Sequence, residues 1–222
     1  MKIGVFDSGI GGKIVADELQ LAFTDDEILY AHDREHVPYG NKSPEEIQQL
    51  TLLAITPLIN AGCTVIVIAC NTASTNAISF LRKTHPRIFF IGLEPMIKPA
   101  ATQTKSGVIA VCATRATLAS ESYAILKEMW AKDVRVIEPD CHEWASVIEN
   151  NRSEEIEVAA LVADLRKKRC DVIVLGCTHY HWLKKRFQNA NQNMIILEPT
   201  DAIRQRIDHF KQDYSSFTAA TN

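Results

Sequence analysis

A repeated pattern, in which an apolar strand is followed by a cysteine, most constrains how this chain can fold. The first copy spans residues 65–70 (VIVIAC) and the second spans residues 172–177 (VIVLGC). An earlier cysteine precedes each terminal thiol by seven residues, Cys63 in the first copy and Cys170 in the second. The pattern indicates an internal duplication. Two similar halves facing each other across a cleft would place one thiol on each side of a bound small molecule.

Short β-branched runs alternate with longer amphipathic stretches along the whole chain. Because these runs are apolar at consecutive positions, they are typical of parallel strands that helices cover on both faces. The sequence therefore predicts an α/β fold with mainly parallel sheets, and a capping box at residues 43–46 (SPEE) predicts a helix over 44–61. The expected strands lie near residues 2–6, 27–31, 64–69, 88–92, 107–112, 133–137, 171–176 and 194–197.

The alternation starts afresh after residues 92–96 (GLEPM), which predicts a domain boundary there. A helix expected at about 200–211 could pack on either half. Residues 212–222 show little periodicity, so we expect them to form a mobile tail.

Composition and charge narrow the class of ligand. The 222 residues carry a net charge of −3 with scattered Lys and Arg, so neither a nucleic-acid partner nor an anionic membrane partner is expected. No apolar stretch approaches the length of a membrane span, and we expect a soluble, cytoplasmic protein with a small-molecule ligand. The six cysteines include no Cys-x-x-Cys pair, which favours reduced thiols used singly over a zinc ribbon or a thioredoxin-type site.

The first loop, residues 7–12 (DSGIGG), follows a strand and precedes a helix. It fits neither the dinucleotide fingerprint nor the P-loop, because Ile14 stands where these motifs require Gly and Ser or Thr, respectively. The remaining interpretation is a tight turn that lets backbone amides approach a ligand. Asp7 would then lie at the carboxyl end of the preceding strand, where open α/β sheets bind ligands. The alternative role for Asp7 is simple helix capping.

Two cysteines differ from the others by their position at strand ends. Cys70 opens a helix, and a helix N-terminus lowers a thiol pKa, whereas Cys63, Cys112 and Cys170 lie beside or within strands and are expected in the core. His179 beside Cys177 is best explained as a proton partner.

Other candidate side chains near the strand ends can also be explained without a functional role. A metal site of Cys177, His179 and His181 is less favoured because no further cluster with ligand spacing supports it, and we expect His181 at the surface. Residues 38–40 (PYG) form either a turn or a ligand lid, and residues 113–117 (ATRAT) occupy the ligand-facing strand end of the second half. By itself Glu149 reads as an ordinary exposed carboxylate, and residues 167–169 (KKR) as a solvated helix end.

Taken together, the motifs DSGIGG (7–12), PYG (38–40), ACNTAS (69–74), TRAT (114–117) and GCTHY (176–180) strongly resemble those of the glutamate racemases of the aspartate/glutamate racemase superfamily. The resemblance extends from residue 3 to about residue 185. It implies two pseudo-symmetric α/β domains, one of residues 1–94 plus about 203–222 and one of residues 95–202, with the active site in the cleft between them.

The resemblance also implies roles for individual residues. Cys70 and Cys177 would be the acid/base thiols of a cofactor-independent racemase, with no metal. Asp7 would assist Cys70, while Glu149 and His179 would assist Cys177. The implied substrate contacts are Asp7, Ser8, Tyr39, Gly40, Asn71, Thr72, Thr114, Thr117, Thr178 and His179. Interconversion of L- and D-glutamate would supply D-glutamate for peptidoglycan, and a homodimer is the common default.

Three other functions remain as alternatives. An aspartate or broad-specificity amino-acid racemase would use the same two thiols. A cysteine hydrolase or transferase would need only one of them. A catalytically silent relative would bind glutamate without exchanging its α-hydrogen.

Overall fold

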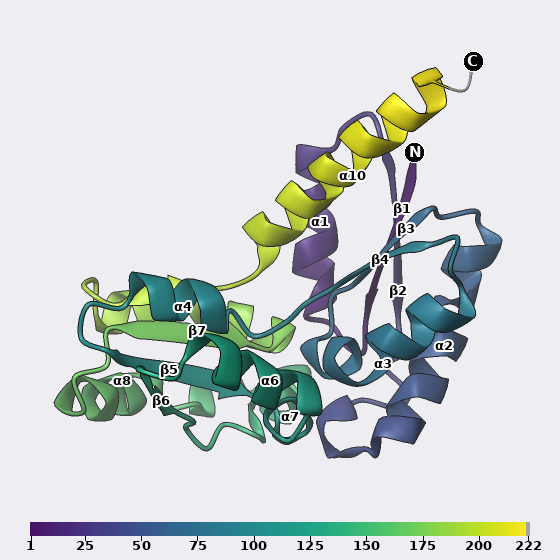
Figure 1. Ribbon diagram of the computed structural model, residues 1–222. Helices are drawn as coiled ribbons and strands as arrows, with labels where there is room; N and C mark the ends of the chain where they lie inside the picture. The colour runs from purple at the N-terminus through teal and green to yellow at the C-terminus, as the bar shows by residue number, and fades with distance from the viewer. Residues whose placement is uncertain (221–222) are drawn as a thin grey trace.

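Two parallel sheets, each built in the same way, form the framework of the protein. The computed structural model describes residues 1–220, and the side chains of residues 1–213. Within this part of the chain, one four-stranded sheet has the order β2-β1-β3-β4 and the other has the order β6-β5-β7-β8. Figure 1 shows the two sheets in separate halves of the molecule. The common strand order agrees with the internal duplication read from the sequence.

The first half consists of the following elements. They are β1 (Lys2–Asp7), α1 (Gly12–Ala22), β2 (Glu27–His32), the short 3₁₀ helix η1 (Tyr39–Asn41), α2 (Pro44–Asn60), β3 (Val65–Ile68), α3 (Asn71–Thr84) and β4 (Phe89–Gly92).

The second half and the last helix follow in the same alternation. They are α4 (Ile97–Gln103), β5 (Val108–Ala113), α5 (Arg115–Leu118), α6 (Glu121–Trp130), β6 (Arg135–Ile137), α7 (Trp144–Glu149), η2 (Ser153–Glu155), α8 (Val158–Lys167), β7 (Val172–Gly176), η3 (Thr178–Leu183), α9 (Lys184–Ala190), β8 (Ile195–Leu197) and α10 (Thr200–Ala220).

All eight expected strands and the capped helix are confirmed, with ends shifted by no more than a few residues. Helix α2 begins at Pro44, and the Ser43 Oγ accepts a hydrogen bond from the Glu46 amide at 3.2 Å. Such a cap satisfies one of the amides that a helix start leaves without an intrahelical partner.

Alternate residues of each central strand enter two different cores, as expected for strands covered on both faces. In β3, Ile66 and Ile68 pack in the core that faces α2 and α3, whereas Val65 and Val67 pack in the core that includes α1 and α10. Strand β7 alternates in the same way between cores of the second half. The continuous apolar runs in the sequence follow from this double burial.

Strand order decides which residues meet at the edge of each sheet. The chain leaves β1 toward β2 on one side and returns to β3 on the other, so the connections diverge between β1 and β3. The second sheet diverges between β5 and β7. Open α/β sheets bind ligands at the carboxyl ends of strands where connections diverge, and Asp7, Cys70, Thr114 and Cys177 lie at or just after these ends.

Helix α10 returns to the first half after the second sheet is complete, and lies along α1 (Figure 1). Ile203 and Ile207 join the core of β1 and β3, and the Phe210 ring stacks on Phe89 with centroids 4.4 Å apart. The domain boundaries at residue 94 and near residue 203 stay predictions, and these contacts support grouping α10 with the first half.

Residues 212–220 of the expected mobile tail are helical, because α10 continues to Ala220, and their mobility stays a prediction. The stretch 200–220 contains neither Gly nor Pro, so nothing in it interrupts the helical backbone. Residues 221–222 of that expected tail lie outside the described residues.

Two further sequence expectations concern membranes and disulfides. None of the helices in residues 1–220 is long and apolar enough to cross a membrane. The six cysteines, all within the described residues, are free and buried, as expected for reduced thiols. Cys63, Cys112 and Cys170 lie in the cores as predicted.

Candidate active site between the two halves

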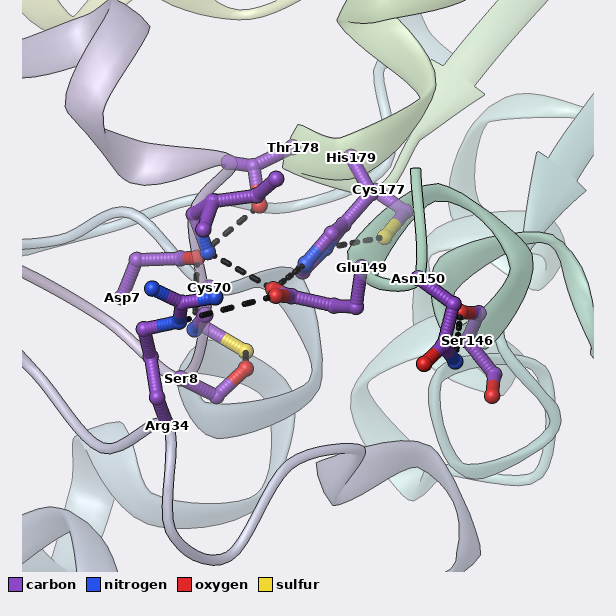
Figure 2. Close-up of polar contacts among 12 residues, drawn as sticks. Asp7, Ser8, Arg34, Cys70, Ser146, Glu149, Asn150, Cys177, Thr178 and His179 are labelled. Carbon is purple, nitrogen blue, oxygen red and sulfur yellow. Dashed lines mark hydrogen bonds and ion pairs between the residues drawn. The ribbon is translucent and has the colours of Figure 1, made fainter. Parts of the chain in front are cut away.

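The carboxyl ends of the central strands of both sheets meet at one buried site. Asp7 ends β1 and Cys70 follows β3, while Thr178 and His179 come directly after the Cys177 that follows β7. Contacts between side chains join these residues across the two halves (Figure 2). The strand-end residues that the sequence singled out are therefore neighbours in space, although up to 171 positions separate them in the chain.

Asp7 and Ser8 surround the first thiol. The Ser8 Oγ lies 3.3 Å from the Cys70 sulfur, which also accepts from the Ala73 amide at 3.4 Å. Asp7 is fully buried, and its carboxylate accepts from the Gly9 amide at 3.0 Å and from the Thr178 hydroxyl at 2.9 Å. Asp7 thus closes the turn after β1 and contacts the second half. The helix-capping alternative is wrong, because the N-cap of α1 is Gly11 and no described side chain caps that helix.

The second thiol has an imidazole and a carboxylate as partners. The Cys177 sulfur lies 3.6 Å from the Nδ1 of His179, and the Nε2 of that ring lies 2.5 Å from the Glu149 Oε1. The same Oε1 accepts from the Ile10 amide at 2.7 Å. Glu149 lies at the end of α7 with a side chain only 9% exposed, so it is not the ordinary exposed carboxylate that its sequence context indicated.

Burial and hydrogen bonding together set the protonation of this chain of groups. Burial lowers the pKa of His179, but its hydrogen bonds to Cys177 and Glu149 outweigh burial and hold the pKa well above 6.5. Burial raises the pKa of Glu149, and the hydrogen bonds from His179 and the Ile10 amide outweigh it, so the pKa falls below 4.5. An imidazolium between a carboxylate and a sulfur is the favoured state.

The environment of Cys70 is different. Burial, followed by the nearby Asp7, raises the pKa of Cys70 to about 12, although Ser8 and the Ala73 amide act in the opposite direction. The expectation that the helix N-terminus would lower the pKa of this thiol is wrong for the protein without substrate. Desolvation of the thiolate outweighs a single long bond from an amide at the start of α3.

The glycines of the first loop let the two halves approach closely. A Cβ at Gly9 would lie 1.9 Å from the Glu149 Oε1, and a Cβ at Gly11 would lie 2.7 Å from the backbone nitrogen of His179. A side chain at Gly9 would displace the Glu149 carboxylate, and a side chain at Gly11 would push the backbone of the second half away. The loop was expected to approach a ligand, and in this structure it approaches Glu149 and His179.

Hydroxyl groups from both halves meet beside the thiols. The Thr72 Oγ1 lies 2.8 Å from the Thr114 Oγ1 and 3.4 Å from the Thr117 Oγ1. Asn71 is 2% exposed, and both its amide nitrogen and its amide oxygen lack a hydrogen-bond partner among the described residues. Since buried polar groups are nearly always paired, this amide is free to bind a ligand.

The segment after β2 covers this hydroxyl cluster. Tyr39 is buried, and a Cβ at Gly40 would lie 3.0 Å from the Thr114 side chain, so the segment contacts the second half. The Tyr39 hydroxyl donates to Asp33 at 2.7 Å, and burial followed by this bond raises the pKa of Tyr39. Asp33 was not among the predicted site residues, and its place in the polar loop before Tyr39 is its only signal in the sequence.

The expectation that His181 lies at the surface is wrong, because this residue is only partly exposed and its Nε2 is buried with no partner among residues 1–213. In the 3₁₀ segment η3, side chains three positions apart lie above one another, so His181 shares the inward face of Thr178. Residues 167–169 are exposed as predicted. Within the described part of the chain, no group of three or more His, Cys, Asp and Glu residues is placed to hold a metal ion.

Comparisons with known proteins agree with this geometry. Residues 13–206 match the sequence model of the Asp/Glu/Hydantoin racemase family. A glutamate racemase of a Roseiflexus species is 39% identical over 216 residues, covering 95% of this chain and 79% of that protein. A glutamate racemase of Herpetosiphon aurantiacus is 39% identical over 209 residues, covering 92% and 82% of the two chains.

Solved structures show the same architecture. Escherichia coli glutamate racemase, in complex with L-glutamate and the activator UDP-MurNAc-ala, superposes with a TM-score of 0.82 at 30% identity, over 93% of this chain and 80% of that one. Francisella tularensis glutamate racemase with D-glutamate gives 0.80 at 26% identity, over 96% and 82%. From the match over most of its length and from the shared two-sheet architecture, we conclude that this chain belongs to the Asp/Glu/Hydantoin racemase family, whose members are isomerases.

Proposed function

We propose that the protein interconverts L-glutamate and D-glutamate by moving a proton through Cα between two thiols, Cys70 and Cys177. The observation that carries the proposal is the pairing of each buried sulfur with its own set of polar partners, at equivalent strand ends of two duplicated halves. The two sets of partners meet, because Thr178, next to Cys177, donates to Asp7 at 2.9 Å at the turn that carries Ser8, the partner of Cys70.

Inversion at carbon explains why two thiols are needed. A single base returns the proton to the face from which it came, whereas a second acid on the opposite face delivers a proton that inverts the centre. A hydrolase or transferase would use one activated thiol, and its chemistry would leave the second set of partners without a role. The duplicated arrangement therefore favours a racemase.

The two thiols have different partners. With its pKa raised to about 12, Cys70 holds its proton before substrate binds. The His179 imidazolium, held by Glu149, stands 3.6 Å from the Cys177 sulfur and can donate a hydrogen bond to a thiolate there. In one direction Cys177 would take the α-proton while Cys70 supplies its own, and in the other direction the roles reverse.

The remaining predicted residues would hold and polarise the substrate. Removing an α-proton without an electron sink requires polar groups that stabilise the developing negative charge electrostatically. Hydroxyls, amides and a carboxylate at the site provide such groups and would keep Cα between the sulfurs. The groups assigned to substrate binding are Asp7, Ser8, Tyr39, Gly40, Asn71, Thr72, Thr114, Thr117, Thr178 and His179.

Glutamate is the substrate favoured over aspartate. The relatives that share 39% identity with this chain are glutamate racemases, whereas an aspartate racemase from Picrophilus torridus, at 16% identity and a TM-score of 0.63, shares the fold alone. Turnover of L-glutamate and of L-aspartate at equal concentrations would decide between the two substrates. Higher turnover of aspartate would contradict the assignment.

We also propose a cellular role, compartment and assembly. D-Glutamate from this reaction would supply peptidoglycan synthesis. Six buried cysteines without a disulfide suit the reducing cytoplasm. A symmetric homodimer is the expected assembly, and light scattering coupled to size exclusion would measure it.

The decisive experiment incubates L-glutamate with the protein in deuterated water. We expect the optical activity to be lost, which circular dichroism measures. We also expect each glutamate to gain one deuterium at Cα, which mass spectrometry measures. Replacing either Cys70 or Cys177 by Ala should abolish racemisation, whereas Cys63→Ala, at a buried thiol outside the site, should preserve it. If the wild-type protein causes neither change at high concentration, the proposal fails, and glutamate binding alone would then indicate the silent relative.

A further inference from the structure

A cleft of about 270 Å³ lies beside Glu149, between the loop that follows β2 and helix α7. Most other residues of the candidate site are buried. The cleft therefore borders Glu149, a proposed catalytic residue, on the side that faces solvent. Its lining combines residues of the first half with residues of the second half: Arg34, Val37, Pro38, Ser146, Glu149 and Asn150.

Arg34 reaches across this cleft toward the second half. Its Nε lies 3.9 Å from the Glu149 Oε2, and Figure 2 shows the two side chains extending toward each other. The other oxygen, Oε1, is already engaged by the Ile10 amide and by His179. Glu149 is therefore attached to the first half at two points, of which Arg34 is the outer one.

The exposure of the two partners differs in a way that suits a movable contact. The Arg34 side chain is 57% exposed, while the Glu149 side chain is 9% exposed. A long ion pair with one partner largely in water contributes little to folding stability, because solvent screens it and the arginine loses side-chain entropy on pairing. Such a pair opens at little cost in free energy and would hold the two halves together only weakly.

The chemistry of a guanidinium fits the expected substrate. Its planar fork of N–H donors binds carboxylates in a bidentate manner, and an amino-acid dicarboxylate brings two of them. An arriving carboxylate can therefore take the place of Glu149 on Arg34 without leaving a charge unpaired.

We propose that Arg34 is a positioning residue that gates the site: its guanidinium pairs with Glu149 across the mouth of the cleft and exchanges that partner for a substrate carboxylate on binding and release. The inference rests on the proposed function, since it assumes a dicarboxylate substrate. Arg34 lies outside the motifs that resemble glutamate racemases, so the inference adds a new residue to those proposed to act in the reaction.

Loss of Arg34 should also change how Glu149 titrates. Two further ionisable groups, His179 and Tyr30, lie close enough to interact electrostatically with Glu149. Arg34 and His179 both favour the ionised carboxylate, so removing the guanidinium moves the pKa of Glu149 upward, toward its ordinary value. The acidic limb of the pH profile of racemase activity should therefore shift to higher pH.

The test compares Arg34→Gln, Arg34→Lys and a control, Glu35→Gln, which alters an exposed charge on the same loop. In Arg34→Gln we expect KM for glutamate to rise about threefold to tenfold and to depend less on salt, since one steering charge is gone. The acidic limb of the pH profile of Arg34→Gln should move up by a few tenths of a pH unit, and its kcat should change less than its KM. Arg34→Lys should show values between those of the wild type and Arg34→Gln. Glu35→Gln should leave KM and the limb unchanged.

Two outcomes would overturn the inference. One is a wild-type KM and pH profile in Arg34→Gln, with thermal unfolding confirming that the variant is folded. The other is an equal change in Glu35→Gln, which would indicate a general effect of loop charge. If the wild-type protein exchanges no α-hydrogen of glutamate, the proposed function fails and the inference falls with it. Normal exchange in the wild type, together with a wild-type KM and pH profile in Arg34→Gln, defeats the inference alone.

Discussion

Single residues in this site lack hydrogen-bond partners that folding alone would favour. Asn71 is the clearest example, because its whole side-chain amide is buried with no hydrogen-bond partner in the part of the chain that the structure describes. A buried polar group left unpaired costs about 1–3 kcal/mol, a cost that selection for packing alone would remove. The residue is therefore better explained by what it binds than by what it stabilises.

Asn71→Leu should separate these two roles. Because Leu has a similar volume and no polar atoms, we expect the free energy of unfolding to stay level or to rise by about 1 kcal/mol, while KM for glutamate rises roughly tenfold. Urea unfolding and steady-state kinetics measure the two effects. The matched control is Asn76→Leu, which loses a 2.8 Å bond to the Thr72 carbonyl and should gain no stability. A strongly destabilised Asn71→Leu would contradict this account.

The pair of Glu149 and His179 should give stability a distinct pH dependence. Glu149 has a lowered pKa, so its contribution is complete above 4.5 and is lost as pH falls through the pKa of the folded state. His179 has a raised pKa, so its contribution is complete below 6.5 and is lost as pH rises through the pKa of the folded state. The two windows overlap between pH 4.5 and 6.5.

Glu149→Gln should therefore destabilise the protein most between pH 4.5 and 6.5, by roughly 1.5–3 kcal/mol, the usual range for hydrogen bonds to charged groups. Urea unfolding at several pH values measures the difference from the wild type. Glu155→Gln, at an exposed carboxylate paired with Arg152, is the control and should show a much smaller effect. A difference that stays constant from pH 4 to 8 would count against the assigned ionisation states.

At the scale of elements, the loop between β1 and α1 decides how closely the two halves meet. Gly9 faces the flexible end of a side chain, Glu149, whereas Gly11 faces the backbone at Thr178 and His179. A side chain can move aside more cheaply than a backbone segment, so the same substitution should have different consequences at the two positions.

Gly9→Ala should displace the Glu149 carboxylate and lower kcat by about 10²-fold or more, with a modest change in thermal stability, because acid–base partners contribute typically 10²–10⁴-fold. Gly11→Ala should lower the melting temperature more, since the added methyl group would lie 2.7 Å from backbone atoms. Kinetics and calorimetry on both variants measure the contrast. Equal melting temperatures with equal activities would refute it.

At the scale of the whole molecule, α10 connects the end of the chain to its beginning. Lys211 bonds to Asp26, and the charged N-terminus pairs with the same carboxylate at 2.6 Å. Together with the stack of Phe210 on Phe89, these contacts fasten α10 to the first half.

Phe210→Ala tests the proposed grouping of residues 203–222 with the first domain. The loss of a partly buried aromatic pair should cost about 1–3 kcal/mol. Amide hydrogen exchange should increase in β1 and β4, with little change in β5 and β7. Leu21→Ala, at an 81% exposed side chain, is the control and should have no such effect. Faster exchange centred on the second sheet would reverse the assignment.

Local patterns in the sequence determined the strands, the duplication and the strand-end positions of Asp7, Cys70 and Cys177, because strand burial and helix capping depend on neighbours in the chain. Only the tertiary structure decided what depends on distant neighbours. It decided the burial of Glu149 against His179 and Ile10, the high pKa of Cys70 beside Asp7, the inward face of His181 and the contact of Arg34 with Glu149. These properties come from desolvation and charge between segments that only the packing of two halves brings together.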